Sequence, residues 1–228
     1  MNLLHPSRFF DLSSYKHSDL FLNTTFVWEA LSAIPHYLAK YPLGKIEVDV
    51  PAGVHLVNPT QISIGKGTVL EPGAYIQGPC IIGENCTVRH GAYIRGNFIA
   101  GDECVIGHDT EVKNSIFLNH ACAAHFAYLG DSILGSYTNL GAGTKCANLK
   151  FDKTAVSILI GEERVNTGLK KIGAIIGDHC QTGCNSVLNP GTLFGKYVFC
   201  YPCVNVGGYI ADKQIVKSSQ KIILIPIE

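Results

Sequence analysis

The chain has 228 residues and carries 18 Lys and Arg against 18 Asp and Glu, so its formal net charge is zero. This balance argues against a surface for nucleic acid or anionic membranes, and the length fits one domain with an appendage. No stretch approaches the ~20 apolar residues of a membrane span, and the N-terminus lacks a secretory pattern. We therefore expect a cytoplasmic protein with reduced cysteines.

Residues 1–45 differ from the rest of the chain and are predicted to form a helical appendage. Apolar residues recur at roughly helical spacing over 26–38. Asn23 is the expected N-cap, and Pro35 is expected to interrupt or kink the helix. The remainder, residues 46–228, is predicted to be a separate β domain.

A six-residue repeat governs the β domain. Every sixth residue from Ile64 to Leu118 is a branched aliphatic in nine of ten cases, and eight of the ten positions from Thr68 to Cys122 are small. Neither an α-helix nor an alternating strand keeps such a period, whereas a parallel β-helix does, because each strand and its corner use one hexapeptide. The repeat therefore predicts an all-β solenoid.

A second period of 18 residues indicates three hexapeptides per coil. It places four residues at one corner, where we expect a positive φ that suits glycine and asparagine: Gly65, Gly83, Gly101 and Asn119. Six cysteines fall on inward positions and are interpreted as small buried hydrophobes rather than zinc or redox groups: Cys80, Cys86, Cys104, Cys122, Cys180 and Cys200.

The repeat stops and then resumes. Leu134 and Leu140 continue it, and it returns from Ile176 onward. The interruption at about 146–171 is predicted to project from the coils as a hairpin turning near Gly161. Projecting loops on a rigid scaffold often carry function. The last residues, 222–228, are predicted to form a closing strand.

His125 is the leading catalytic candidate. It lies where the repeat loses its register, since ten residues between Ala124 and Leu134 do the work of twelve. We expect such a slip to push the imidazole, a natural proton acceptor, out of the wall. Arg95 and Lys113 lie 18 residues apart, so they stack on one face, where a phosphate between them would relieve their repulsion. A packing histidine and a solvated basic stripe are the alternatives.

These residues carry a resemblance. The repeat and the stretch "HFAYLGDSILGSYTNLGAGTKCANLKFD" resemble the left-handed β-helix acyltransferases, in particular the sugar-phosphate acetyltransferases of UDP-N-acetylglucosamine synthesis. The resemblance implies a left-handed coil, a homotrimer with sites between subunits, acetyl-CoA as cosubstrate and no metal. The uridylyltransferase domain of the bifunctional members is not seen, so a separate nucleotidyltransferase is a possible partner.

The resemblance also implies roles for individual residues. It makes His125 the general base, with Asn148 orienting the substrate or the base. It places the amino-sugar phosphate at Arg95, Lys113, Tyr128, Asn139 and Lys153. It places coenzyme A at Ala142, whose N–H would contact the thioester, and at Cys184 and Cys200.

We therefore expect an N-acetyltransferase that moves acetyl from acetyl-CoA to the amine of an amino-sugar 1-phosphate. One alternative keeps the chemistry but takes a nucleotide-linked amino sugar or a longer acyl donor. A second is a non-catalytic trimeric scaffold. A third is a zinc enzyme like the γ-carbonic anhydrases, because His120 and His125 are five residues apart and His90 lies upstream.

Overall fold

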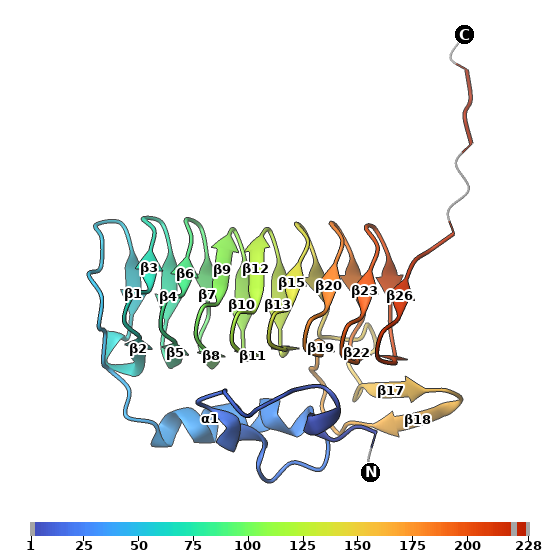
Figure 1. Cartoon of the computed structure of the whole chain (residues 1–228), viewed down its shortest axis with the longest axis horizontal. Helices are drawn as coiled ribbons and strands as arrows, with labels where there is room; N and C mark the ends of the chain where they lie inside the picture. Colours follow the sequence, from blue (N-terminus) through green and yellow to red (C-terminus); the bar gives the residue numbers. More distant parts are fainter. Residues whose placement is uncertain (1–2, 220–222, 227–228) are drawn as a thin grey trace.

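The computed structural model describes residues 3–219 and 223–226. It is a left-handed parallel β-helix of about nine turns, with an N-terminal helical segment lying along one side (Figure 1). In the part described, three eight-stranded sheets form the sides of the prism. In each coil the chain runs from sheet A to sheet C to sheet B, so the prism has an A–C edge, a C–B edge and a B–A edge. The predicted fold class is confirmed.

The strands are short, and each pairs in parallel with its counterparts one coil away. Sheet A consists of β2 (Ile62–Ile64), β5 (Cys80–Ile82), β8 (Phe98–Ala100), β11 (Ser115–Phe117), β14 (Ile133–Leu134), β19 (Ala174–Ile176), β22 (Thr192–Phe194) and β25 (Tyr209–Ile210). Sheet C consists of β3 (Val69–Leu70), β6 (Thr87–Val88), β9 (Val105–His108), β12 (Cys122–His125), β15 (Asn139–Leu140), β20 (Gln181–Thr182), β23 (Phe199–Cys200) and β26 (Ile215–Val216). Sheet B consists of β1 (His55–Val57), β4 (Tyr75–Gln77), β7 (Tyr93–Ile94), β10 (Glu111–Lys113), β13 (Tyr128–Gly130), β16 (Lys145–Cys146), β21 (Val187–Leu188) and β24 (Asn205–Val206).

The interior is a packed apolar core with the predicted period, but the slip lies elsewhere than predicted. Every sixth residue from Ile64 to Val112 is buried in it. The next inward residues are Phe117, Ala123, Leu129 and Leu134, so two steps are shortened to five residues, before Phe117 and before Leu134. Both lie at the B–A edge and neither lies at His125. The second falls inside the predicted range from Ala124 to Leu134, whereas the first was missed.

The B–A edge takes up all the variation in coil length among these sheets. The A–C and C–B edges always use six residues from one inward residue to the next. At the B–A edge the step from one inward residue to the next varies in length. It takes eight residues at 56–64, where η3 (Pro59–Gln61) lies, five residues at 112–117 and at 129–134, thirty residues at 146–176 and four residues at 206–210.

The early shift of register corrects two further predictions. Cys122 lies on the outward side of β12 and is half-buried, although the other five cysteines assigned to inward positions are buried. Asn119 stacks beside Asp102, whose N–H it accepts at 3.0 Å, rather than beneath Gly101.

The glycines at the A–C edge are explained by close approach, not by φ. A Cβ on Gly83 would lie 2.3 Å from the Gly101 carbonyl oxygen of the next coil. The positive φ falls two residues later along the chain, for example at Asn85 and Glu103.

The N-terminal segment covers the outer face of sheet A. It contains η1 (Pro6–Arg8), η2 (Ser18–Phe21) and α1 (Glu29–Lys40), and it buries the outward aliphatics Ile81, Ile99, Ile116, Ile133, Ile175 and Leu193. The predicted helix exists, but Asn23 does not cap it. The Glu29 carboxylate instead accepts the Thr25 and Phe26 N–H groups (2.7 and 2.9 Å), and the helix continues through Pro35.

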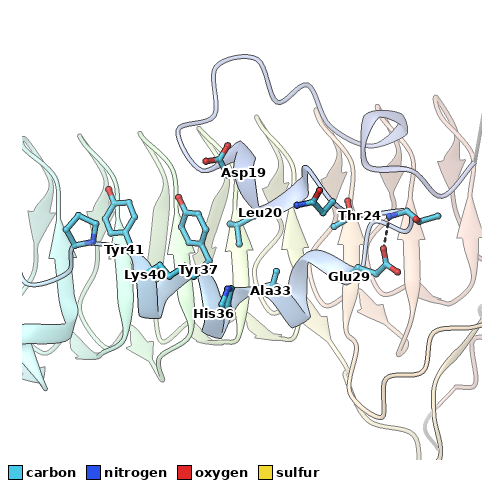
Figure 2. Close-up of a pocket in the computed structure, with 12 residues that line it drawn as sticks. Asp19, Leu20, Thr24, Glu29, Ala33, His36, Tyr37, Lys40 and Tyr41 are labelled. Atoms are coloured by element: carbon cyan, nitrogen blue, oxygen red, sulfur yellow. Dashed lines mark hydrogen bonds between the residues drawn. The ribbon is translucent and has the colours of Figure 1, made fainter.

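A hollow of about 850 Å³ lies between η2 and α1 (Figure 2). Tyr37 and Tyr41 line it on the α1 side, and Asp19 lines it on the η2 side. His17, which does not line the hollow, is buried, and its Nδ1 lies 2.8 Å from the hydroxyl of Tyr37. Burial lowers the pKa of His17 to about 4. None of the sequence-predicted site residues lines this hollow.

The interruption is a hairpin, as predicted. It consists of β17 (Ser157–Ile160) and β18 (Glu163–Asn166), turns at Gly161 (φ 60°) and packs Val156 and Ile158 beside the later coils of sheet A. The predicted closing strand lies partly outside the described residues. Its described part, 223–226, forms no strand and is exposed. Within the described ranges, none of the helices has the length and apolarity needed to cross a bilayer.

Candidate active site

His125 ends β12 at the C–B edge, where the chain leaves sheet C for sheet B. It pairs with His108 one coil earlier, and its carbonyl accepts the Gly143 N–H one coil later at 3.0 Å. The side chain is exposed, and within the described residues its imidazole forms no hydrogen bond or ion pair. The base candidate is therefore accessible and free to accept a proton.

Ala142 and Cys184 continue the same row along the C–B edge. The Asn185 N–H donates to the Ala142 carbonyl (2.8 Å), and the Cys203 N–H donates to the Cys184 carbonyl (2.9 Å). In the part of the chain that the structure describes, the Ala142 N–H has no acceptor. The coils thus align His125, an unused backbone N–H and Cys184 on one edge.

A second group of predicted residues lies across sheet B, at the B–A edge. The buried Asp131 carboxylate accepts the Lys113 ammonium at 2.8 Å and the Asn148 side-chain amide at 2.5 Å. Tyr128, on the outer face of β13, donates its hydroxyl to the Asn148 Oδ1 at 3.4 Å, and burial raises its pKa. Asp131, which was not among the predicted site residues, therefore joins a group that contains three of them: Lys113, Tyr128 and Asn148.

Arg95 and Lys113 stack one coil apart, as predicted, but each is already paired. The Arg95 Nη1 lies 2.7 Å from the Glu111 carboxylate, an ion pair that raises the pKa of Arg95. Lys113 is paired with Asp131. The two carboxylates relieve the repulsion from which a phosphate was inferred, so the cluster is neutral before any ligand arrives.

The two groups occupy opposite ends of the sheet B strands. His125 is the last residue of β12, and Gly130, the partner of Lys113 in the next coil, is the last residue of β13. Among the described residues the Asn148 side chain bonds to Asp131 and Tyr128 and forms no hydrogen bond with His125, so its predicted role in orienting the base gains no support from this geometry.

The remaining predicted residues lie apart. Asn139 is exposed on the outer face of sheet C, between Cys122 and Gln181. Lys153 is exposed in the loop that follows Asn148 and does not line the hollow of about 460 Å³ that Lys150 and Asp152 help to form. Cys200 is 4% exposed and its thiol lies in the core, so this side chain is not available to a ligand outside the coil.

Sequence reasoning missed Lys145, which lies beneath Tyr128 on the outer face of sheet B. Its ammonium donates to the Gly143 carbonyl at 2.7 Å. Of the cations that the structure describes on this face, Arg95, Lys113 and Lys145, it alone has no carboxylate within 4.0 Å. Its place one strand position before inward-facing Cys146 was a signal that the side chain points outward.

The histidines of the zinc alternative do not converge. His120 lies at the A–C edge, stacked on Tyr137 at 4.3 Å, whereas His125 lies at the C–B edge. No group of three or more His, Cys, Asp or Glu suited to a metal ion occurs among the residues described.

Comparison with known proteins adds to this geometry. Residues 52–96 match the profile of the bacterial transferase hexapeptide family (six repeats), and residues 76–169 match the GMPPB C-terminal domain. Over 88 residues the chain is 39% identical to a bifunctional sugar-1-phosphate nucleotidylyltransferase/acetyltransferase from Sulfurisphaera tokodaii, covering 39% of this chain and 22% of that one. Over 169 residues it is 34% identical to the bifunctional protein GlmU of Methanococcus maripaludis, covering 74% of this chain and 40% of that one.

The chain thus spans well under half the length of these relatives, and the two profile matches, over residues 52–96 and 76–169, lie on the part of the chain with the six-residue repeat. The repeat, the three-sided parallel coil and the profile match agree with one another. Residues 52–96 thus match the hexapeptide-repeat transferases, and the same six-residue repeat continues along the coil.

Proposed function

We propose that this protein is an N-acetyltransferase that moves acetyl from acetyl-CoA to the amine of an amino-sugar 1-phosphate, glucosamine-1-phosphate first of all. The observation that carries the proposal is the row on the C–B edge, where the unengaged His125 imidazole and the unused Ala142 N–H lie one coil apart. A base and an oxyanion donor are the two groups that acyl transfer to an amine needs. The names of the partial relatives support the same reaction class.

In the proposed reaction the sugar amine attacks the thioester carbonyl carbon, and His125 takes the proton that the amine loses. The Ala142 N–H donates to the oxyanion that develops on the carbonyl oxygen. Collapse of this intermediate forms the amide and breaks the C–S bond, and the departing thiolate takes the proton from His125. General-base help of this kind contributes roughly 10²–10⁴-fold in rate.

The acceptor's phosphate is proposed to bind at the B–A edge, to Arg95 and Lys113, near Tyr128 and Asn148. Because that edge and His125 lie at opposite ends of sheet B, we propose a homotrimer in which one copy supplies the base and its neighbour the phosphate site. A separate nucleotidyltransferase would then carry the product on to UDP-N-acetylglucosamine in the cytoplasm.

A thiol-release assay with acetyl-CoA tests the function against glucosamine-1-phosphate, galactosamine-1-phosphate and UDP-linked amino sugars. We expect turnover of a sugar 1-phosphate, with a higher kcat/KM than for the UDP-linked amino sugars. Preference for a UDP-linked sugar or for a longer acyl-CoA would move the protein to the alternative acyltransferase class. Binding of acetyl-CoA without turnover of any acceptor would favour the scaffold.

A further inference from the structure

Asp131 is a buried carboxylate, 6% exposed, at which side chains from three successive passes of the chain meet. Its Oδ2 accepts the Lys113 Nζ and the Asn148 Nδ2, and its Oδ1 accepts the Asn114 Nδ2 at 2.9 Å. A carboxylate is costly to bury unless it is paired and hydrogen-bonded. Here it receives one cation and two amides, so the arrangement is compensated and specific.

The shortened corner puts this carboxylate in place. Asp131 has φ 50° at the second five-residue step of the B–A edge, a backbone region that Asp tolerates better than most residues. Its N–H donates to the Lys113 carbonyl (3.1 Å), and its own carbonyl accepts the Gly173 N–H (2.8 Å). The backbone is thus fixed from the coil above and from the coil below.

The position of Asp131 determines what Lys113 and Asn148 present to the outside. An ammonium has three hydrogens, and Asp131 takes one of them, which leaves two for another acceptor. An ionised carboxylate only accepts, so the Asn148 amide must turn its nitrogen to Asp131 and its oxygen to the Tyr128 hydroxyl. Gly130 leaves room for this, since a Cβ there would lie 2.5 Å from the Asn148 Nδ2.

We propose that Asp131 is a positioning residue for the acceptor phosphate: it directs the Lys113 ammonium and sets the amide orientation of Asn148. This rests on the proposed function, because it assigns the phosphate of the sugar acceptor to the same edge. Asp131 does not touch the substrate itself. It keeps a neutral, preformed donor set in which Lys113 can exchange solvent for phosphate without losing its carboxylate partner.

The first test does not depend on activity. The full-length protein and Asp131→Asn are labelled with an amine-reactive anhydride, and modification of Lys113 is followed by mass spectrometry, with exposed Lys153 as the internal reference. We expect Lys113 to react at least fivefold faster in Asp131→Asn, because its ammonium is released. Glu111→Gln, the matched change at the carboxylate that pairs with Arg95, should leave the Lys113 rate unchanged. An unchanged Lys113 rate in Asp131→Asn would overturn the proposal.

The second test separates positioning from general structural damage. In Asp131→Asn the KM for the sugar 1-phosphate should rise at least tenfold, while the KM for acetyl-CoA stays within twofold. An equal rise in both KM values, or a loss of kcat with neither KM changed, would overturn the proposal.

A second variant is used if Asp131→Asn does not fold. Asn114→Gly removes one hydrogen-bond donor to Asp131 at a position with positive φ, and it should raise the labelling rate of Lys113 about twofold. No rise in that rate would count against the proposal. If the wild-type protein turns over no amino-sugar phosphate, the proposed function fails, whereas the labelling still decides whether Asp131 positions Lys113.

Discussion

The same repeat builds the outer faces of sheet A and sheet B, but one face is covered by the N-terminal segment and the other is exposed. On sheet A the middle residue of most strands is aliphatic, as in Ile99 of β8 and Ile116 of β11, and the N-terminal segment covers the row. On sheet B the outward residues include Tyr93, Glu111 and Tyr128, and the face is open. The inward residues give the fold, and the outward residues decide which face is closed and which can meet a ligand.

The largest expected effect is on turnover, from a substitution at His125 on the exposed C–B edge. His125→Ala should reduce turnover by several hundredfold or more, in line with the roughly 10²–10⁴-fold that a general base contributes. The Tm and acetyl-CoA binding should not change, because the side chain packs against nothing in the core. His108→Ala is the matched control on the same edge, since its imidazole already contacts the His90 carbonyl at 2.9 Å. Near-wild-type turnover of His125→Ala would remove the base assignment.

The closed face should respond in stability instead. Ile116→Ala removes a fully buried side chain between sheet A and the N-terminal segment, and we expect a loss of about 2–5 kcal/mol in the free energy of unfolding. Urea unfolding measures it. Val69→Ala, an exposed outward residue of sheet C, should cost less than about 0.5 kcal/mol. Equal losses for the two variants would contradict a covered sheet A.

The covering segment should also be sensitive to acid through His17. Its pKa is about 4 in the folded protein against 6.5 in the unfolded chain, so the unfolded state binds more protons between these values. Stability should therefore be full above pH 6.5 and fall by up to about 3 kcal/mol as the pH drops to 4. His17→Phe should flatten this part of the pH profile, and His36→Gln, an exposed position on α1, should not. A profile unchanged in His17→Phe would assign the acid sensitivity to other groups.

The smallest expected effect lies at the phosphate edge. Lys113→Met removes one charged donor, and we expect the KM for the sugar 1-phosphate to rise roughly tenfold. The acetyl-CoA KM and the kcat should change less than threefold. Lys145→Met is the informative comparison, because no carboxylate of the described residues lies within 4.0 Å of the Lys145 ammonium. A larger KM effect from Lys145→Met than from Lys113→Met would move the phosphate site toward Gly143.

Much of the fold could be predicted from the sequence, because an inward aliphatic every six residues has no other common explanation. The hairpin at Gly161 could also be predicted, from two short apolar runs around a turn. The covered face could have been recognised as well. A residue next to an inward position points outward and is expected to be polar, but Ile99, Ile116 and Ile133 at such positions are aliphatic.

The candidate site was harder to predict, because two of its features depend on exact register. A fixed six-residue count carried past Val112 turns Cys122 inward and puts the slip at His125, although one residue is lost before Phe117 and another before Leu134. The partners of Arg95 and Lys113 were not among the predicted site residues. Asp131 lies 18 residues after Lys113, so the period that stacks Arg95 on Lys113 could also have placed this carboxylate beside Lys113.

The B–A edge has a consequence for how such a protein can change. Two edges of the prism are fixed at six residues, whereas this one holds a step of four, two steps of five, a step of eight and a thirty-residue excursion without disturbing the stacked coils. Residues can therefore be inserted or deleted at this edge while the strands of the three sheets remain paired. New loops grafted at this edge should therefore leave the solenoid intact.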